Sequence, residues 1–397
     1  MFFIAFLIAM VAVYYLQRHV FFSDIFDRLD YSAELETREV YSGDDVYMYE
    51  EITSNRRLPI PYIKVNTELP RGLKFRLTER KNGDIKDNLM QNVQSVFVLH
   101  GKRKIRRRWR IACLKRGRYN VGSAIMVSGD IFGMKPVSKT MTADEGNVLT
   151  VLPSTVDLAE KFISSNLENG DILSNRRLLS EPYLRAGVRD YTAGDPMRKV
   201  NWKLSAAHGK LLVNMEEFTK KRSFNIFLNM NTREIERDPE NLCDPTAIER
   251  CITVCSSIFE KVLPEGIPLR LISNGPPPSS DGETGLSNGD EVGEKLFFSK
   301  EYEGRGDLRD AQRMLAGIDL SLTVPYDKVL DHIASNPHHY CEGGGLVVVT
   351  PFIDERMLNF YRVMKSKGTE TVFYVTATFG NSTYNTDECD VYFATDF

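Results

Sequence analysis

Two patterns of hydrophobic positions divide the chain, one with the period of a strand and one with the period of a helix. Between residues 25 and 151, apolar and polar residues alternate in short segments, as in residues 46–52 after the turn at 43–45. Turns that contain proline or glycine separate these segments. Short alternating strands at this spacing predict a β-sandwich domain over residues 25–151.

From residue 223 onward, short apolar segments alternate with amphipathic ones. Asp244 and Pro245 predict the start of a helix, because aspartate is a good N-cap and proline suits the first helical position. Further helices are expected from Asp307, from Pro325 and over residues 354–367, and buried-type strands over residues 224–228, 269–272, 346–349 and 372–375. Strands that alternate with helices predict a mostly parallel sheet covered on both faces. The expected fold of residues 223–397 is therefore α/β.

The first sixteen residues carry no charged side chain, and Gln17, Arg18 and His19 follow them directly. A helix of this length spans about 24 Å, which is short of the hydrocarbon core, but a snorkelling Arg18 and the apolar residues 20–22 add length. No basic residue precedes the run and no small-residue cleavage site follows it, which favours an anchor over a signal peptide. The sequence predicts a transmembrane helix over residues 1–22. Arg18 and Arg28 place the bulk of this single-pass protein on the cytoplasmic side of the cell membrane.

The composition is that of an ordinary globular protein. Its 397 residues allow two or three domains, and a net charge of −3 gives no general attraction to nucleic acid, which is not expected as a partner. The six cysteines show no C-x-x-C spacing. Cys251 and Cys255, four apart on a predicted helix, could hold a metal, but buried core positions are the commoner reason for this spacing.

A local exception to this charge balance is the basic run from Lys102 to Arg110, which includes Trp109. We interpret this run as an exposed strand whose solvated charges protect a sheet edge. The alternative is contact with anionic lipid headgroups, because the domain follows a predicted membrane anchor.

Residues 189–217 form the most densely polar stretch of the chain, and turn and helix-cap residues follow one another closely in it. Asp195 and Pro196 predict a helix that begins with Asp195 as its N-cap. Met197, Val200 and Leu204 share one apolar face of this helix, and Gly209 is expected to end the helix in the left-handed conformation. Alternation at positions 211, 213 and 215 then predicts a strand.

This stretch resembles the core signature of the domain-of-unknown-function family 58, R-x-Y-x-x-G-D-x-x-R-x-[IV]-[ND]-W-K-x-[ST]-A followed by G-x-L-x-V. The matching positions that we take as interaction or signature residues are Arg189, Tyr191, Gly194, Asp195, Arg198, Trp202, Lys203 and Gly209. Residues 115–122 and 130–133 resemble the family's upstream R-G-x-Y-x-x-G…D-x-F-G region. Residues 152–222 are then a connecting segment that carries the signature. We interpret its polar residues as an ion-paired helix cap with Trp202 as a buried anchor; a charged groove for a peptide is the alternative.

The resemblance also implies that residues 223–397 form a von Willebrand factor A-like (Rossmann-like) domain. Such domains hold a divalent cation with a D-x-S-x-S motif, a threonine and a later aspartate, because hard cations prefer carboxylate and hydroxyl oxygens. Here Asn229, Asn231 and Arg233 occupy the first motif, and Thr350 follows the later strand. The expected metal site is degenerate, with no metal and no cofactor bound.

The resemblance implies a membrane-anchored, non-enzymatic scaffold that works with a MoxR-type AAA+ ATPase in protein assembly or maturation. The sequence contains no G-x-S-x-G, H-E-x-x-H or P-loop motif, and no catalytic residue is predicted. Two alternatives stay open. One is a hydrolase-like enzyme that uses the polar cluster between Arg189 and Lys203, and the other is a module that binds anionic lipids through Lys102 to Arg110.

Overall fold

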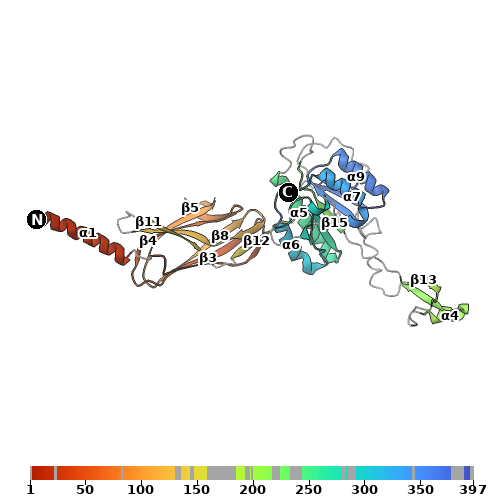
Figure 1. Ribbon diagram of the computed structural model, residues 1–397, viewed down its shortest axis with the longest axis horizontal. Coiled ribbons are helices and arrows are strands. Elements are labelled where there is room, and N and C mark those ends of the chain that lie inside the picture. Colours follow the sequence, from red (N-terminus) through yellow and green to blue (C-terminus); the bar gives the residue numbers. More distant parts are fainter. Residues whose placement is uncertain are drawn as a thin grey trace. The chain divides into compact units, whose positions relative to one another are not determined.

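The computed structural model describes residues 2–21, 25–81, 84–129, 136–143, 147–158, 185–192, 197, 200–216, 224–232, 244–278, 283–284, 292–341, 345–376 and 389–393 (Figure 1). The chain divides into two compact units. The first contains Met1–Ser154, Pro278–Ser280 and Arg309–Ile318, and the second contains Thr155–Pro277, Asp281–Leu308 and Asp319–Phe397.

The first unit is a β-sandwich. Its five-stranded sheet has the order β1 (Leu29–Leu35), β3 (Asp45–Ser54), β8 (Lys104–Cys113), β5 (Leu73–Lys81) and β6 (Asp84–Met90). A four-stranded sheet has the order β11 (Pro136–Thr142), β10 (Ser123–Gly129), β4 (Ile60–Glu68) and β7 (Asn92–Leu99). A small sheet joins β2 (Glu39–Tyr41), β12 (Val148–Leu152) and β9 (Gly117–Asn120). Every second side chain of β3 is buried, as the predicted period of two requires.

Among the described residues, two apolar clusters lie in the core of the sandwich. One cluster joins β3, β5 and β8 to β12 and contains Phe75 and Ile111. The other joins β1 and β3 to β4, β7 and β10 and contains Ile63 and Met126. Face-to-face contact between the inner faces of two sheets is what excludes water from a sandwich.

The second unit contains a seven-stranded sheet in the order β17 (Glu283–Thr284), β18 (Phe297–Phe298), β16 (Leu269–Ser273), β15 (Phe224–Leu228), β19 (Leu346–Thr350), β20 (Thr371–Val375) and β21 (Val391–Phe393). The strands from β16 to β21 in this order are parallel to one another, and β17 and β18 pair antiparallel. Every residue of β19 and β20 is buried, so both faces of the sheet are covered there.

Helices α7 (Tyr326–Ser335) and α9 (Glu355–Ser366) share one apolar cluster with β19 and β20. Helix α5 (Pro245–Val262) contacts β15 and β19. Asp244 accepts a hydrogen bond from the Thr246 amide, and Pro245 opens the helix, so the predicted start of α5 is confirmed. Shorter helices of this unit are η2 (Leu263–Glu265), η3 (Gly293–Lys295), η4 (Arg305–Asp307) and α8 (Pro337–Tyr340), whereas α6 (Leu308–Ala316) belongs to the first unit from Arg309 onward.

The family signature falls on a small element of the second unit that we call the signature unit. It consists of the antiparallel pair β13 (Arg185–Asp190) and β14 (Leu212–Glu216) with the helix α4 (Trp202–His208). Asn201 caps α4, because its side chain accepts a hydrogen bond from the Leu204 amide. Gly209 ends the helix with φ 67°, in the predicted left-handed conformation.

Two predictions about the fold class are wrong. Helix α1 (Phe2–Phe21) is present, but within the part of the chain that the structure describes, no helix is long and apolar enough to cross a membrane. The predicted anchor and the single-pass localisation in the cell membrane are therefore overturned; the apolar run ends at Leu16, and Gln17, Arg18 and His19 lie in the same helix.

The other correction concerns the balance of the fold. Antiparallel strand pairs outnumber parallel ones among the described strands. The predicted von Willebrand A-like α/β fold class is therefore wrong for this chain, which is mostly β-sheet. The helical periodicity on which that prediction relied was confined to the second half of the sequence.

Candidate functional site

The carboxyl ends of β15, β16 and β19 meet at one edge of the parallel sheet, where open α/β sheets usually bind ligands. Asn229 and Asn231 follow β15, Asn274 follows β16, and Thr350 ends β19. All four side chains have 0% exposure. The structure thus brings together Asn229, Asn231 and Thr350, which the sequence had placed at a degenerate metal site; Arg233 lies outside the described residues.

Hydrogen bonds join these four side chains into one network. The Asn229 side-chain amide donates to Thr350 Oγ1 at 3.1 Å, and Asn229 Oδ1 accepts from the backbone amide of Asn231 at 3.0 Å. Asn274 Oδ1 accepts from the backbone amide of Met230 at 2.7 Å. The Asn274 side-chain amide donates to Asn231 Oδ1 at 3.0 Å. Each amide oxygen of the network therefore already accepts a hydrogen bond.

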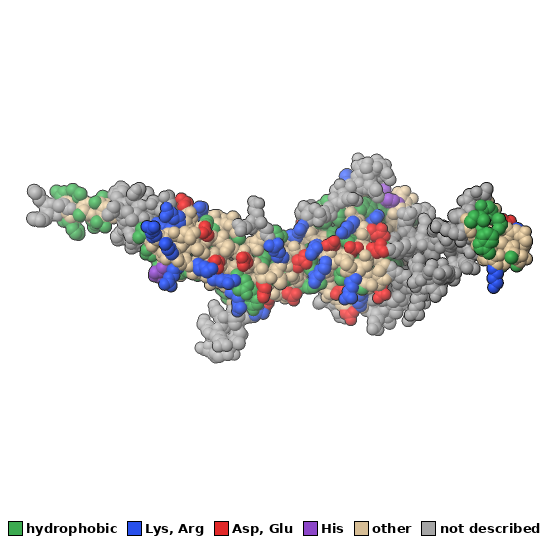
Figure 2. Space-filling model, turned by 90° about the horizontal axis from the view of Figure 1, so that it is seen from below, with side chains coloured by type: hydrophobic (Ala, Val, Ile, Leu, Met, Phe, Trp, Pro, Cys, Tyr) green, Lys and Arg blue, Asp and Glu red, His purple; other side chains and the backbone are tan. Residues whose placement is uncertain are grey.

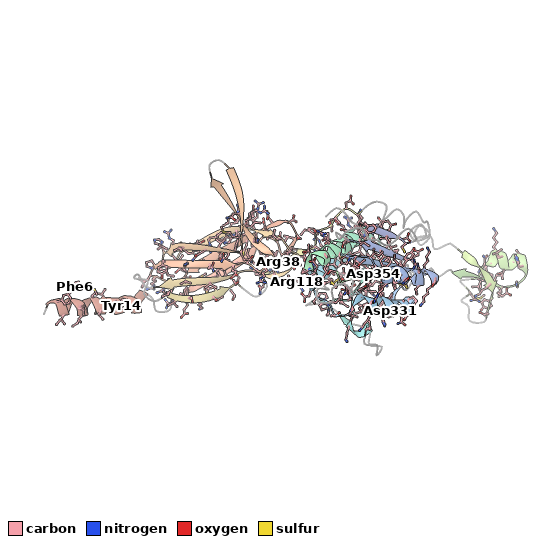
Figure 3. All side chains as sticks on the ribbon, turned by 90° about the horizontal axis from the view of Figure 1, so that it is seen from above. Phe6, Tyr14, Arg38, Arg118, Asp331 and Asp354 are labelled. Atoms are coloured by element: carbon pink, nitrogen blue, oxygen red, sulfur yellow. The ribbon has the colours of Figure 1, made fainter. Side chains whose placement is uncertain are left out.

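The same network holds the start of α7. Asn231 Oδ1 also accepts from the backbone amide of Tyr326 at 3.0 Å, and the Asn274 side chain donates to the Val324 carbonyl at 3.0 Å. The Tyr326 hydroxyl donates to Asp354, whose other oxygen caps α9 by accepting from the Met357 amide at 2.9 Å. Figure 3 labels Asp354 in this unit. Burial and the hydrogen bond to Asp354 raise the pKa of Tyr326, which stays a neutral donor.

The chemistry of this edge is that of amides and hydroxyls. A hard cation prefers several carboxylate oxygens with free lone pairs, and Asn229, Asn231 and Asn274 supply neutral oxygens that are engaged with one another. In the described segments, no group of three or more His, Cys, Asp or Glu side chains is placed to hold a metal ion. The Nδ2 atom of Asn231 is buried and has no hydrogen-bond partner. The arrangement is suited to fixing the strand ends and α7 in place.

Sequence reasoning missed Asn274 and the Tyr326–Asp354 pair. Asn274 lies two positions after the predicted strand 269–272 and directly follows β16, and that position was the available signal, because polar residues after parallel strands meet at one edge. No local pattern indicated that Asp354 would accept from a tyrosine 28 positions earlier.

The signature residues occupy a different element, the signature unit. Arg189 on β13 is exposed and donates to the Asp190 carbonyl at 3.2 Å and to Thr192 Oγ1 at 3.3 Å, and Tyr191 is half-buried. Lys203 is exposed on α4. Gly194, Asp195 and Arg198 lie outside the described residues.

Two predictions about the signature helix are wrong. The predicted continuous helix from Asp195 is interrupted, because Val200 forms a β-bridge with Val213 and α4 begins at Trp202 with Asn201 as its N-cap; Asp195 itself lies outside the described residues. Trp202 is 60% exposed and therefore is not the predicted buried anchor. The position next to the sheet belongs to Ser205, whose Oγ accepts from the Leu212 amide at 2.8 Å. A helix of two turns presents only one narrow face to a sheet, and Ser205 occupies it.

Lys104 to Arg110 of the basic run lie on β8, and several of their charges are paired with side chains of β3. Arg107 donates to the fully buried Glu50 at 2.6 Å, and Arg110 pairs with Asp45 at 2.6 Å. Lys104 pairs with Glu51 at 3.2 Å. The Arg106 and Arg108 guanidinium groups lie over the rings of Tyr49 and Tyr47, at 4.9 and 4.7 Å from the centroids. The charges of this strand thus have partners inside the protein.

The cysteine pair on α5 lies in the core. Cys251 and Cys255 are both 0% exposed, and Cys251 Sγ is 3.2 Å from Thr376 Oγ1. Burial raises the pKa of the Cys251 thiol to about 12 and raises that of Cys255 as well. Since thiolates are the metal ligands, these neutral thiols behave as core side chains.

No family model matches the chain. Among curated proteins, the uncharacterized protein YeaD of Bacillus subtilis (strain 168) is 26% identical over 246 residues, which cover 62% of this chain and 55% of YeaD. The chain thus spans about half the length of this relative.

Solved structures match parts of the chain at low similarity. A mutant Salmonella alpha-2-macroglobulin is 13% identical with a TM-score of 0.24, over 32% of this chain and 9% of that one. Spo0M, the sporulation control protein of Bacillus subtilis, is 13% identical with a TM-score of 0.15, over 30% and 50%. Similarity at this level carries no argument about fold or function. The comparisons supply no support for the von Willebrand A likeness that the sequence suggested.

Proposed function

We propose that this chain is a non-enzymatic protein-interaction protein, a scaffold that acts with a MoxR-type AAA+ ATPase in the assembly or maturation of other proteins. The observation that carries the proposal is the hydrogen-bonded side-chain network at the carboxyl edge of the parallel sheet. Asn229, Asn231, Asn274 and Thr350 are fully buried there and bond to one another. This edge of the sheet, where ligands usually bind, is occupied by side chains that stabilise the unit. We therefore expect the outer surfaces to carry the function.

The partner comes from the family resemblance of the signature, which the sequence carries from Arg189 onward. An ATPase that remodels proteins needs an adaptor that binds a client or a neighbouring protein without altering it chemically. A protein built from a sandwich and a second compact unit offers several surfaces for such contacts.

The test is reconstitution with a MoxR-type AAA+ ATPase from the same organism. The full chain and the ATPase are mixed with a non-hydrolysable ATP analogue and passed over a size-exclusion column, and the rate of ATP hydrolysis is measured in parallel. We expect co-elution and a change in the hydrolysis rate, and an AAA+ ATPase of another class serves as the control. If the two proteins elute separately at micromolar concentration and the rate is unchanged, the proposal is wrong.

A second arm tests the enzymatic alternative. The chain is assayed against generic ester and peptide substrates, together with Arg189→Ala and Lys203→Ala. Turnover that both substitutions abolish would show that the polar signature residues are catalytic and would refute a scaffold.

A further inference from the structure

The described part of the signature unit, taken with the residues that join α4 to its strands, exposes several large apolar side chains. Among the residues of this part whose burial the structure describes, the buried ones are Val200, Leu212 and Val213 with the polar Asn201 and Ser205. The large apolar side chains described as exposed are Met197 at 53%, Trp202 at 60%, Leu204 at 36% and Leu211 at 41%. Figure 2 shows hydrophobic side chains gathered over this small element. Exposed apolar patches of this kind mark interaction sites.

Trp202 distinguishes this surface from incidental exposure. Tryptophan is enriched at interfaces, because it buries a large apolar area and loses few rotamers on binding. The chain has two tryptophans, and the other one, Trp109, is half-buried and donates to Glu50 at 2.7 Å. A tryptophan left exposed on a two-turn helix contributes little to folding.

Positive charge accompanies the apolar side chains. Residues 185–216 carry six lysines and arginines against three aspartates and glutamates, in a chain whose net charge is −3. Each of the four exposed apolar residues is next in sequence to a cation, as Trp202 and Leu204 are to Lys203, and Leu211 is to Lys210. Lys210 pairs with Asp190 at 2.8 Å, which uses one cation and one carboxylate of this set and leaves the excess of positive charge unchanged. A partner that covers this surface must supply apolar contacts and negative charge together.

We infer that the signature unit is a docking surface for an acidic protein segment that carries apolar side chains. The inference rests on the proposed function and names the surface and the partner chemistry that this function uses. The partner's apolar side chains contact Trp202 and its aliphatic neighbours, and its carboxylates pair with Lys203. Single-stranded nucleic acid fits less well, because bases stack on aromatic rings, and three of the four exposed apolar residues are aliphatic.

The test uses the fluorescently labelled full chain on an array of twelve-residue peptides in which acidic and apolar content vary independently. We expect binding to peptides that are both acidic and apolar, and weak binding to basic–apolar, acidic–polar and neutral–apolar peptides. Binding should weaken as NaCl rises, since salt screens the pairing with Lys203.

Two variants and two matched controls localise the binding. Trp202→Ser should lower the affinity for the best array peptide at least about tenfold, as expected for an interface tryptophan, and Lys203→Glu should reverse the preference for acidic peptides. Val96→Ser, which replaces a side chain of similar exposure (63%) on β7, and Lys328→Glu, on α7, should leave binding unchanged. Circular dichroism checks that every variant remains folded.

Four outcomes would overturn the docking surface. They are the absence of any preference for acidic–apolar peptides, binding that survives Trp202→Ser, tight binding of labelled oligo-dT that Trp202→Ser abolishes, and a dimer in sedimentation velocity that the same substitution dissolves. If the ATPase complex survives Trp202→Ser while the array shows no preference, the surface is refuted and the proposed function stands. If the unmodified chain binds peptides but no ATPase, the proposed function is refuted and the surface stands.

Discussion

Glu50 is the most informative position for testing how the basic strand β8 contributes to the protein. It is 0% exposed, and its Oε2 accepts from Arg107 at 2.6 Å and from Trp109 Nε1 at 2.7 Å. Its Oε1 accepts from Thr67 Oγ1 at 3.0 Å. Glu50→Ala removes one partner from all three donors and leaves a guanidinium that is only 14% exposed without its carboxylate.

The expected cost of Glu50→Ala is about 3–5 kcal/mol in the free energy of unfolding, the range found when one partner of a buried ion pair is removed. For a unit of this size, that loss lowers the melting temperature by roughly 6–20 °C. Trp109 provides the signal, because in a Trp202→Phe background it is the sole tryptophan of the chain. Its fluorescence during guanidinium or thermal unfolding reports on the sandwich alone.

The matched control is Glu51→Ala, one position along the same strand. Glu51 pairs with Lys104 at 3.2 Å, but the lysine side chain is 64% exposed, so the loss should stay below about 1 kcal/mol. The double variant Glu50→Leu, Arg107→Leu should be less destabilised than Glu50→Ala, because no buried charge is left unpaired. Equal losses for the two glutamates would refute the reasoning, and so would a double variant that is less stable than Glu50→Ala.

Four further predictions concern the second unit. Trp202→Ala and Lys203→Ala should each change the free energy of unfolding by less than about 1 kcal/mol, because both side chains are exposed. A loss near 3 kcal/mol in thermal unfolding of Trp202→Ala would show that Trp202 is a buried anchor after all. Asn274→Ala should cost about 2–4 kcal/mol in denaturant titration, because it leaves buried donors and acceptors without partners. Excess Mg²⁺ should leave the melting temperature unchanged, and a rise that Asn274→Ala abolishes would contradict this. Burial raises the pKa of the Cys251 thiol to about 12. The neutral thiol therefore contributes its full stability below the unfolded-state pKa of about 8.5, and this contribution is lost as the pH rises toward 12. A free energy of unfolding that stays constant above pH 9, or alkylation of Cys251 before the half-exposed Cys389, would refute this prediction.

Helix boundaries show where prediction from the sequence succeeded and where it failed. Asp244 and Pro245 start α5 as expected, and Gly209 ends α4 in the left-handed conformation. The start of α4 was placed at Asp195, but Asn201 caps the helix instead. Both residues are good N-caps, so the local pattern alone could not choose between them.

The sequence by itself determined the type and place of many local elements of this protein. The apolar segments at residues 224–228 and 346–349 became β15 and β19, because strand and cap preferences depend on residues a few positions apart. Tertiary structure alone decided which side chains meet. Glu50 and Arg107 are 57 positions apart, and Asn229 and Thr350 are 121 apart. Their contacts depend on which strands pair and in which order they lie in the sheet, and the few residues around each partner do not specify that order. An asparagine at the end of a strand has the same local pattern whether it faces a cation or another amide, and a tryptophan on a short helix has the same pattern whether it is covered or exposed.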